Sequence, residues 1–204
     1  MGDVTYHRCV SQRSELSKLE WRRDLLEVRR SLSAPDLQRA AEGLFATACR
    51  EPLVASARTV AVYAALPPEP EVGLLTSWYE SRGTRVLLPI LHDDNDLGWG
   101  ETSAGLVPGR FGLSEPSVDL GVDAVRAAEL VLCPALAVDE SGVRLGRGGG
   151  SYDRALAHLP PETPVVAVVY DTELVAELPS DPHDHRVGFA LTPTRLVPLR
   201  PHMP

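Results

Sequence analysis

Arg144-Leu-Gly-Arg-Gly-Gly-Gly-Ser-Tyr-Asp153 lies between two short apolar runs, Glu129-Leu-Val-Leu-Cys133 and Pro164-Val-Val-Ala-Val-Val-Tyr170. Runs of this kind are typical of parallel strands that are covered on both faces. The glycine-rich segment leads into a predicted helix from Ser151 to about Leu159, so together the segments predict a strand–helix–strand crossover. This unit indicates an α/β fold with a largely parallel central sheet.

The rest of the chain continues this alternation of helices and strands. Two helices come first, one from Ser14 and one from the N-cap box Ser33-Ala-Pro-Asp36, whereas residues 1–13 show no periodicity and are expected to fray. Further strands are predicted at 59–63, 85–89 and 187–192, and further helices at 71–81 and 171–178. Residues 92–118 are rich in turn-forming residues and predict short strands within a long excursion.

Three loops are candidates for a common binding site. In parallel sheets, ligands bind beyond the carboxyl ends of the strands. The loops at 64–71, 134–150 and 171–186 each follow a predicted strand, so we expect them to converge.

The composition is that of an ordinary globular protein, because 44% of the 204 residues are hydrophobic and 24% are charged. This length predicts a single α/β domain over residues 1–204. The net charge of −8 disfavours a nucleic-acid-binding protein, which needs a basic face. No apolar run reaches the roughly 18 residues of a membrane span, and the N-terminal residues lack the apolar core of a signal peptide. We therefore expect a soluble, cytoplasmic protein that binds neither nucleic acid nor membranes.

Cysteine and serine chemistry is not indicated. Cys9, Cys49 and Cys133 are far apart and form no C-x-x-C motif, so neither a disulfide framework nor a cysteine zinc site is predicted. Cys133 ends a buried strand before Pro134 and is interpreted as a core residue. The chain has no G-x-S-x-G elbow, and the position of Ser151 at a helix start favours an N-cap.

The glycine-rich segment has the features of an anion-binding loop. Four glycines in five positions directly before a helix let backbone amides converge on an anion. Arg144 and Arg147 add positive charge that suits phosphate. The pattern is neither a Walker A loop nor G-x-G-x-x-G. A flexible surface loop or a tight turn is the alternative interpretation.

Lys18 is the only lysine, beside 19 arginines. Where arginine is used so generally, a single lysine suggests a position that needs a compact, mobile ammonium rather than a planar fork. The alternative is a solvent-exposed residue on a helix face.

Acidic side chains lie in several of the predicted loops. They are Glu69, Glu71, Asp153, Asp181 and Asp184. Two carboxylates brought together beside phosphates would suit Mg²⁺, which prefers oxygen ligands. The pair His183 and His185 leaves a transition-metal site or a solvent-exposed polar loop as alternatives.

Four segments, in this order along the chain, form a larger pattern. They are Lys18-x-x-x-Arg22, Tyr63-Ala-Ala-Leu-Pro-Pro-Glu-Pro-Glu71, Phe111-Gly-Leu-Ser-Glu-Pro116, and Leu132-Cys-Pro-Ala-Leu-Ala-Val-Asp139 followed by residues 144–153. From Lys18 to about Thr192 the chain thereby resembles the 5-formyltetrahydrofolate cyclo-ligase family, also called methenyltetrahydrofolate synthetases. The first of these segments resembles the family's Lys/Arg pair that contacts ATP. The second resembles the family's loop with a folate-contacting glutamate, which corresponds to Glu69 here.

The resemblance implies a three-layer, Rossmann-like α/β domain with an N-terminal helical hairpin, acting as a monomer. It also implies that 5-formyltetrahydrofolate is converted with ATP and Mg²⁺ to 5,10-methenyltetrahydrofolate, ADP and phosphate. The implied ATP-binding residues are Lys18, Arg22, Arg144, Leu145, Gly146, Arg147, Gly148, Gly149, Gly150, Ser151 and Tyr152. The implied folate-binding residues are Ala64, Glu69, Arg147, Gly148, Gly149, Gly150 and Tyr152. The implied Mg²⁺ ligands are Asp153 and Asp184, and the implied catalytic residues are Lys18 and Arg147.

Two positions depart from the family pattern. Ser151 stands where the family has a tyrosine, which leaves Trp99 and Phe111 as candidates to fill that space. Gly188 stands where the late motif has a second aspartate. The alternatives are a nucleotide-binding regulator without folate turnover and an ATP-dependent enzyme that acts on another small substrate. The fold alone adds a sugar-phosphate isomerase or an acyl-CoA-type transferase.

Overall fold

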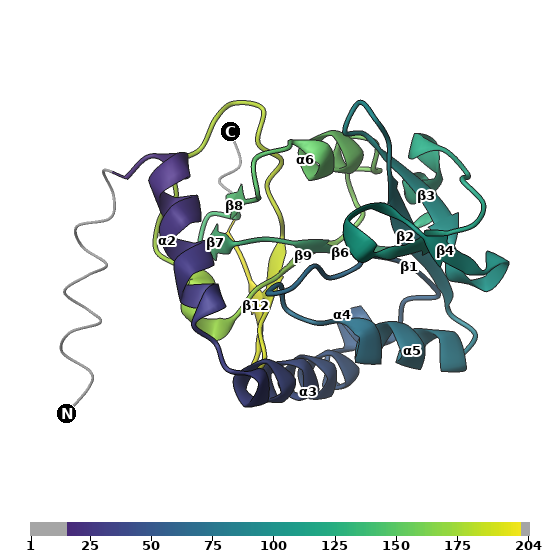
Figure 1. Ribbon diagram of the computed structural model, residues 1–204, viewed down its shortest axis with the longest axis horizontal. Helices are drawn as coiled ribbons and strands as arrows, with labels where there is room; N and C mark the ends of the chain where they lie inside the picture. The colour runs from purple at the N-terminus through teal and green to yellow at the C-terminus, as the bar shows by residue number, and fades with distance from the viewer. Residues whose placement is uncertain (1–15, 201–204) are drawn as a thin grey trace.

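A seven-stranded sheet lies at the centre of the protein in the computed structural model, which describes residues 16–200 (Figure 1). In spatial order, its strands are β12 (Leu196–Pro198), β11 (Phe189–Leu191), β9 (Val165–Val168), β6 (Leu130–Pro134), β1 (Thr59–Val62), β2 (Arg85–Leu91) and β3 (Leu97–Glu101). The five strands from β11 to β2 are parallel, and β12 and β3 pair antiparallel at the two edges. The predicted largely parallel sheet is confirmed. The fraying expected for residues 1–13 lies outside the described residues.

Helices cover both faces of this sheet. The described part of the chain contains the helices α2 (Lys18–Arg30), α3 (Ala34–Arg50), α4 (Pro52–Ala55), α5 (Gly73–Ser81) and α6 (Ser151–Leu156), and the 3-10 segments η1 (Thr102–Ala104), η2 (Arg110–Gly112), η3 (Val122–Ala127) and η4 (Asp171–Glu173). α3, α4 and α5 lie on one face, where Val60 and Val62 pack in one core with Leu44 (Figure 1). Because side chains alternate along a strand, Ala61 points to the other face and packs in the core that contains Leu156 of α6. The result is the expected three-layer arrangement.

The first helix packs on a second, smaller sheet. That sheet has the order β10 (Leu174–Val175), β7 (Ala137–Asp139) and β8 (Arg144–Leu145). Trp21 and Leu25 of α2 are buried in one cluster with Leu145. α3 instead buries its apolar stripe against the central sheet. Both predicted N-terminal helices are therefore present, but each packs mainly on its own sheet rather than on its neighbour as in a simple hairpin.

Reciprocal caps determine where these two helices begin. Ser33 and Asp36 form the predicted capping box at the start of α3. Ser17 and Glu20 form a second box, so α2 begins at Lys18. The predicted start at Ser14 lies outside the described residues.

The predicted helix at 171–178 is wrong. The segment makes one 3-10 turn, η4, and then becomes strand β10, in which Leu174 pairs with Val138 of β7. Glu173 is buried in the interior, where it accepts two hydrogen bonds from Arg29. Pairing with β7 and this buried ion pair outweigh the local helical preference, because backbone groups that bond to a neighbouring strand cannot close helical turns.

The excursion at 92–118 contains the short strands that were expected. β4 (Leu106–Pro108) and β5 (Ser114–Pro116) pair antiparallel and form an arm against β2 and β3. At the tip of this arm Phe111 adopts φ of +56°.

The sheet order creates a crevice between β1 and β6. These strands are neighbours, but β2 lies beyond β1 and β9 lies beyond β6, so the chain leaves them in opposite directions. Ligands of open α/β sheets bind at such a switch point, outside the carboxyl ends of the strands. Within residues 16–200, the helices are too short or too polar to span a membrane.

Candidate functional site

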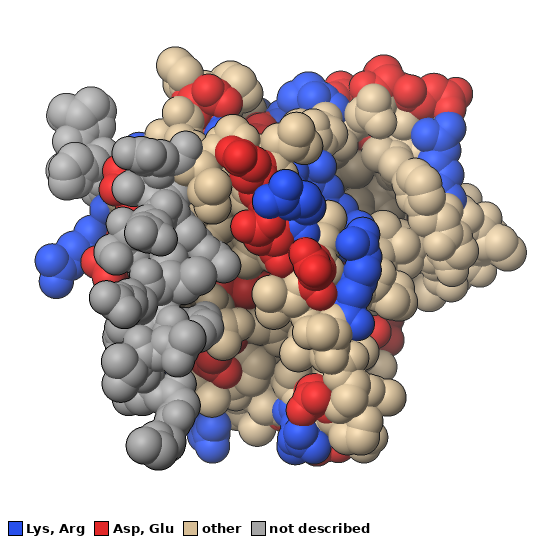
Figure 2. All heavy atoms as spheres, turned by 60° about the vertical axis from the view of Figure 1, so that its left-hand side comes forward, with Lys and Arg blue, Asp and Glu red and all other residues tan. Residues whose placement is uncertain are grey.

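A cavity of about 540 Å³ is lined by residues that follow β1 and β6. This volume is typical of small-molecule sites. The predicted site residues that line it are Lys18, Arg22, Ala64, Glu69, the whole segment 144–153 and Asp184. The expected convergence of the three loops is therefore confirmed. Figure 2 shows that acidic and basic side chains lie interspersed beside a hollow on that face of the molecule.

The glycine-rich segment has a backbone that favours glycine at two positions. Gly148 and Gly150 have φ of +105° and +69°, in the left-handed region. A Cβ atom on Gly148 would lie 3.3 Å from the Cζ atom of Arg22. The Nε atom of Arg22 also donates to the carbonyl oxygen of Gly146 at 2.9 Å. The segment is thus held closely against α2. A flexible surface loop, the alternative interpretation, would not make these contacts.

The start of α6 differs from the prediction. The N-cap of α6 is Gly150, no side-chain hydrogen bond caps the helix, and it ends at Leu156 rather than near Leu159. The interpretation of Ser151 as an N-cap is wrong, because the left-handed Gly150 already turns the chain into the helix. Ser151 is instead the first helical residue and lines the cavity.

Two arginines of the segment are paired with carboxylates. The Nη2 atom of buried Arg144 donates to Oδ1 of Asp153 at 2.7 Å, while its Nε atom has no hydrogen-bond partner among the described residues. The Nε atom of Arg147 donates to Oε1 of Glu69 at 2.7 Å. Arg147 therefore joins the glycine-rich segment to the loop that contains Glu69, and Arg144 retains an unused donor.

Lys18 reaches the cavity from the first turn of α2. Its Nζ atom lies 2.6 Å from a carboxylate oxygen of Asp181 and 2.6 Å from one of Asp184. Burial opposes the ammonium, but the hydrogen bonds and charges of these aspartates outweigh it and raise the pKa of Lys18. Burial likewise opposes the charge of Asp184, but the hydrogen bond from Lys18 prevails and lowers the pKa of that carboxyl. With its side chain 19% exposed, Lys18 is not the solvent-exposed residue of the alternative interpretation.

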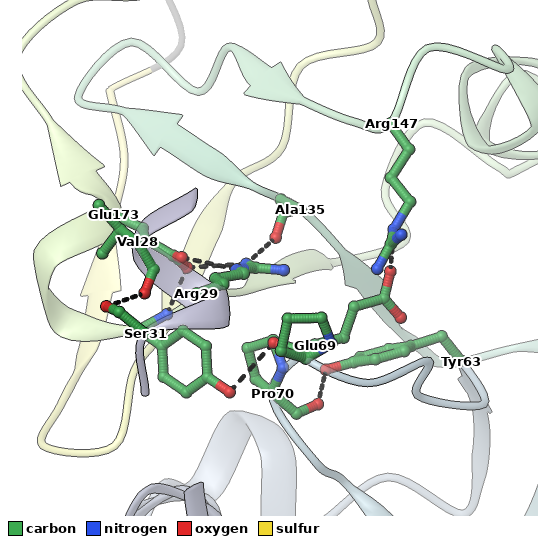
Figure 3. Close-up of polar contacts among 11 residues, drawn as sticks. Val28, Arg29, Ser31, Tyr63, Glu69, Pro70, Ala135, Arg147 and Glu173 are labelled. Atoms are coloured by element: carbon green, nitrogen blue, oxygen red, sulfur yellow. Dashed lines mark hydrogen bonds and ion pairs between the residues drawn. The ribbon is translucent and has the colours of Figure 1, made fainter. Parts of the chain in front are cut away.

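Glu69 points from the proline-rich loop toward Arg147 (Figure 3). Its other oxygen accepts a hydrogen bond from the amide of Leu66 at 2.9 Å, and its side chain is 8% exposed. Glu71 is exposed, accepts a bond from the amide of Gly73 at 2.6 Å, and is not part of the cavity lining. The structure thus separates the two glutamates into a cavity residue and a helix-start residue.

Two tyrosines that the sequence analysis did not select flank this loop. The hydroxyl of Tyr63 donates to the carbonyl oxygen of Pro70 (Figure 3). The hydroxyl of Tyr170 donates to the carbonyl oxygen of Pro68 at 3.3 Å. The available signal was that each tyrosine is the last residue of a predicted buried strand.

Known proteins share both the sequence pattern and the fold. The model of the 5-formyltetrahydrofolate cyclo-ligase family matches residues 14–193. A 5-formyltetrahydrofolate cyclo-ligase of Mycolicibacterium smegmatis is 42% identical over 196 residues, which cover 92% of this chain and 100% of that protein. This chain belongs to the 5-formyltetrahydrofolate cyclo-ligase family. The resemblance seen in the motifs is confirmed, and the enzymes of this family convert 5-formyltetrahydrofolate to 5,10-methenyltetrahydrofolate with ATP.

Two further comparisons agree, one in sequence and one in fold. A 5-formyltetrahydrofolate cyclo-ligase of Escherichia coli K12 is 31% identical over 175 residues, which cover 82% of this chain and 96% of that protein. The NMR structure of 5,10-methenyltetrahydrofolate synthetase from Aquifex aeolicus has a TM-score of 0.77 over 93% of this chain and 95% of that one. At 24% identity, this second likeness shows that the cyclo-ligase fold is shared.

Both predicted metal ligands line the cavity, and both are already hydrogen-bonded. Asp153 accepts bonds from Arg144 and, at 3.3 Å, from the amide of His185. Asp184 accepts bonds from Lys18 and, at 2.7 Å, from the amide of Asp181.

One group of side chains at the cavity has the spacing of a metal site. The ligand atoms of Asp181, His183 and Asp184 lie within 4.8 Å of one another. His185 is not in that group, and burial followed by the charge of Arg144 lowers its pKa. Of the two histidines in the His-x-His alternative, only His183 belongs to this group. It lies there beside two carboxylates, which are ligands of the kind that Mg²⁺ prefers. Asp181 is the carboxylate that the sequence analysis left out of its metal prediction.

The aromatic ring that is missing at Ser151 is not replaced by Trp99. Trp99 is 1% exposed and packs edge-on against Tyr152, with ring centroids 6.5 Å apart. The hydroxyl of Tyr152 is buried and has no partner within the described part of the chain. Phe111 is 74% exposed and lines the cavity from the arm between β4 and β5. Of the two candidates, Phe111 is therefore the one that faces the cavity.

Proposed function

We propose that this protein converts 5-formyltetrahydrofolate and MgATP to 5,10-methenyltetrahydrofolate, ADP and phosphate in the cavity described above. One observation carries the proposal: Lys18, the glycine-rich segment and Glu69 line the same cavity although they come from distant parts of the chain. The basic side chains of this cavity suit phosphates, and the carboxylate of Glu69 suits a ligand with hydrogen-bond donors. Arg147 bonds to Glu69 and so connects the two sets of residues.

The reaction requires activation of a formyl amide. Such a carbon is a poor electrophile and its oxygen is a poor leaving group. Transfer of the γ-phosphoryl group to the formyl oxygen breaks the bond to ADP and converts that oxygen into a phosphate leaving group. N10 then attacks the formyl carbon and loses its proton, phosphate departs, and the five-membered ring closes. The protein contributes positioning and charge neutralisation, as in phosphoryl transfer generally.

The phosphates are assigned to the basic residues of the cavity and the glycine-rich segment. Lys18, Arg22, Arg144 and Arg147 supply positive charge, and the amides of residues 146–150 supply neutral donors. Arg144 supports this assignment, because its Nε–H is buried without an acceptor in the described chain, and such a donor favours a bound acceptor. Leu145, Ser151 and Tyr152 complete the proposed ATP-binding surface.

The residues present also fit a magnesium ion. Asp184 and Asp181 belong to the group of side chains that has the spacing of a metal site, and Asp153, the other proposed ligand, lines the cavity outside that group and pairs with Arg144. Bound there, Mg²⁺ supplies charge neutralisation for the transferred phosphoryl group.

The folate is assigned to the part of the cavity around Glu69. The carboxylate of Glu69 is nearly buried and is oriented by Leu66 and Arg147, so it can accept hydrogen bonds from the donor edge of a pterin. Ala64 and Tyr152 provide apolar surface next to it. The active monomer stays a prediction. The cytoplasmic location stays a prediction.

The proposal is tested by incubating the purified protein with 5-formyltetrahydrofolate and MgATP while following the near-ultraviolet absorbance of the methenyl product. Controls omit ATP or replace it with ADP, and nucleotide binding is measured separately by calorimetry. ATP-dependent product formation is the expected result. Tight nucleotide binding without product would instead identify the regulator, or an enzyme that acts on another small substrate.

A further inference from the structure

Glu69 lies between two prolines, and the carbonyl group of each proline is hydrogen-bonded to a buried tyrosine. Tyr63 donates to the oxygen of Pro70 (Figure 3), and Tyr170 donates to the oxygen of Pro68 at 3.3 Å. The two tethers therefore act on the residues immediately before and after Glu69.

The loop itself has few other means of holding its shape. Proline has no N–H, so Pro67, Pro68 and Pro70 remove three backbone donors from the loop. The amide of Glu69 makes one turn bond to the carbonyl of Leu66 at 2.7 Å. Buried carbonyl groups in such a segment need donors from elsewhere, and the tyrosine hydroxyls provide them.

The tyrosines are themselves fixed by the central sheet. Tyr63 directly follows β1 and Tyr170 lies just after β9, on either side of β6. The amide of Tyr170 donates to Glu173 at 2.8 Å, and the guanidinium of Arg29 lies 5.3 Å from the centroid of the tyrosine ring. Arg29 also bonds to Glu173 with both Nε and Nη2. A buried ion pair thus supports the second tether.

Both hydroxyls remain donors at any pH at which the enzyme can be assayed. Burial raises the pKa of Tyr63 well above its usual value and raises that of Tyr170 to about 12. The tethers therefore do not depend on the titration of either group.

We propose that Tyr63 and Tyr170 are positioning residues for folate binding, whose hydroxyls hold the Pro68–Pro70 segment and thereby direct the Glu69 carboxylate into the cavity. This inference rests on the proposed role of Glu69 in binding the pterin. The rings can stay in place without the hydroxyls, so phenylalanine variants isolate the tether from the packing.

The test compares Tyr63→Phe, Tyr170→Phe and the double variant with Tyr79→Phe. Tyr79 is the matched control, because its buried hydroxyl donates to the carbonyl oxygen of Val54 at 2.8 Å, and it does not line the cavity. Each tether variant should raise the KM for 5-formyltetrahydrofolate about three-fold, and the double variant about ten-fold, as expected for the loss of one and two net hydrogen bonds. The KM for ATP should stay within about two-fold of the wild type in all four proteins, since the phosphate side is untouched.

A second readout does not depend on turnover. Hydrogen exchange of a peptide that covers residues 64–73 should become faster in the double variant and stay unchanged in Tyr79→Phe. An unchanged exchange rate in the double variant overturns the tether itself. An unchanged folate KM with faster exchange, or an equal rise of that KM in Tyr79→Phe, overturns its role in positioning. If the wild type forms no methenyl product, the proposed function fails, and the exchange experiment still decides whether the tether exists.

Discussion

Lys18 and Asp184 are 166 positions apart in the chain, yet the Nζ atom of Lys18 lies 2.6 Å from the Oδ2 atom of Asp184. The pair connects the first turn of α2 with the loop that precedes β11, and both residues line the cavity. The only lysine of the chain is therefore placed where its charge can act on carboxylates and on a bound phosphate.

Replacement of Lys18 should affect ATP far more than the fold. Lys18→Gln should raise the KM for ATP roughly ten-fold, because one point charge is lost from the phosphate side. Lys18→Arg should also lose activity, since a planar fork does not reproduce a compact ammonium. The free energy of unfolding should fall by about 1 kcal/mol or less, because the pair is partly exposed. Steady-state kinetics and urea unfolding measure the two effects, and an unchanged ATP KM in both variants contradicts the assignment.

Asp153→Asn should increase the magnesium concentration needed for half-maximal activity. It should lower kcat more than it changes the KM for folate, because it acts on phosphoryl transfer and not on the pterin side. Asp123→Asn is the control, since Asp123 is exposed and pairs with His158 at 2.9 Å. Activity is titrated against Mg²⁺ and, separately, after zinc chelation. Loss of activity on zinc chelation with indifference to Mg²⁺ would favour the histidine alternative.

Glu69→Gln should raise the KM for 5-formyltetrahydrofolate at least about ten-fold while ATP binding is preserved, because a charged acceptor contributes roughly 1.5–3 kcal/mol. Glu71→Gln is the matched control two residues away. Its carboxylate bonds to the amide of Gly73 at the start of α5, so it should change stability rather than KM. Identical kinetic effects of both variants would show that the loop is assigned wrongly.

Ser151→Tyr should tighten folate binding by up to about ten-fold, because a ring beside the pterin adds roughly 0.5–1.5 kcal/mol. Its melting temperature should not fall through a lost cap, since Ser151 makes no capping bond. Ser151→Ala is the control and should leave both quantities unchanged. If the wild type forms product but Ser151→Tyr does not bind folate more tightly, the space beside the pterin is already filled. Phe111→Ala should then weaken folate binding.

The Arg29–Glu173 pair should be a major contributor to stability. Both side chains are at most 3% exposed, with Nε and Oε1 2.7 Å apart. Arg29→Met leaves a buried carboxylate unpaired and should lower the free energy of unfolding by about 3–5 kcal/mol. The double variant Arg29→Met with Glu173→Leu should regain part of that loss. Arg58→Met is the control, because its partner Glu129 is exposed and such surface pairs contribute about 1 kcal/mol or less. Equal losses in urea unfolding for the two arginine variants would contradict this account.

Local signals in the sequence were sufficient for much of the fold. The Ser33–Asp36 capping box, the apolar runs of β6 and β9 and the glycines of residues 146–150 each act within a few residues. These signals therefore predict local structure without knowledge of which segments pack against them. The motif residues of the candidate site were predicted in the same way, because the resemblance is also a pattern along the chain.

Pairing between distant segments could not be read in this way. Residues 171–178 were predicted as a helix because nothing nearby shows that β7 will pair with Leu174 or that Arg29 will bind Glu173. Ser151 was predicted as an N-cap because the left-handed φ of Gly150 is a property of the folded turn.

The sequence by itself determined the order of strands and helices, the glycine-rich loop and the identity of the charged residues near it. Only the tertiary structure decided that Lys18 meets Asp181 and Asp184, and that Tyr63 and Tyr170 hold the loop around Glu69. The physical reason is that periodicity, caps and backbone preference act over one or two turns of chain. Ion pairs and tethers instead form where the sheet order brings the ends of β1, β6 and β9 side by side.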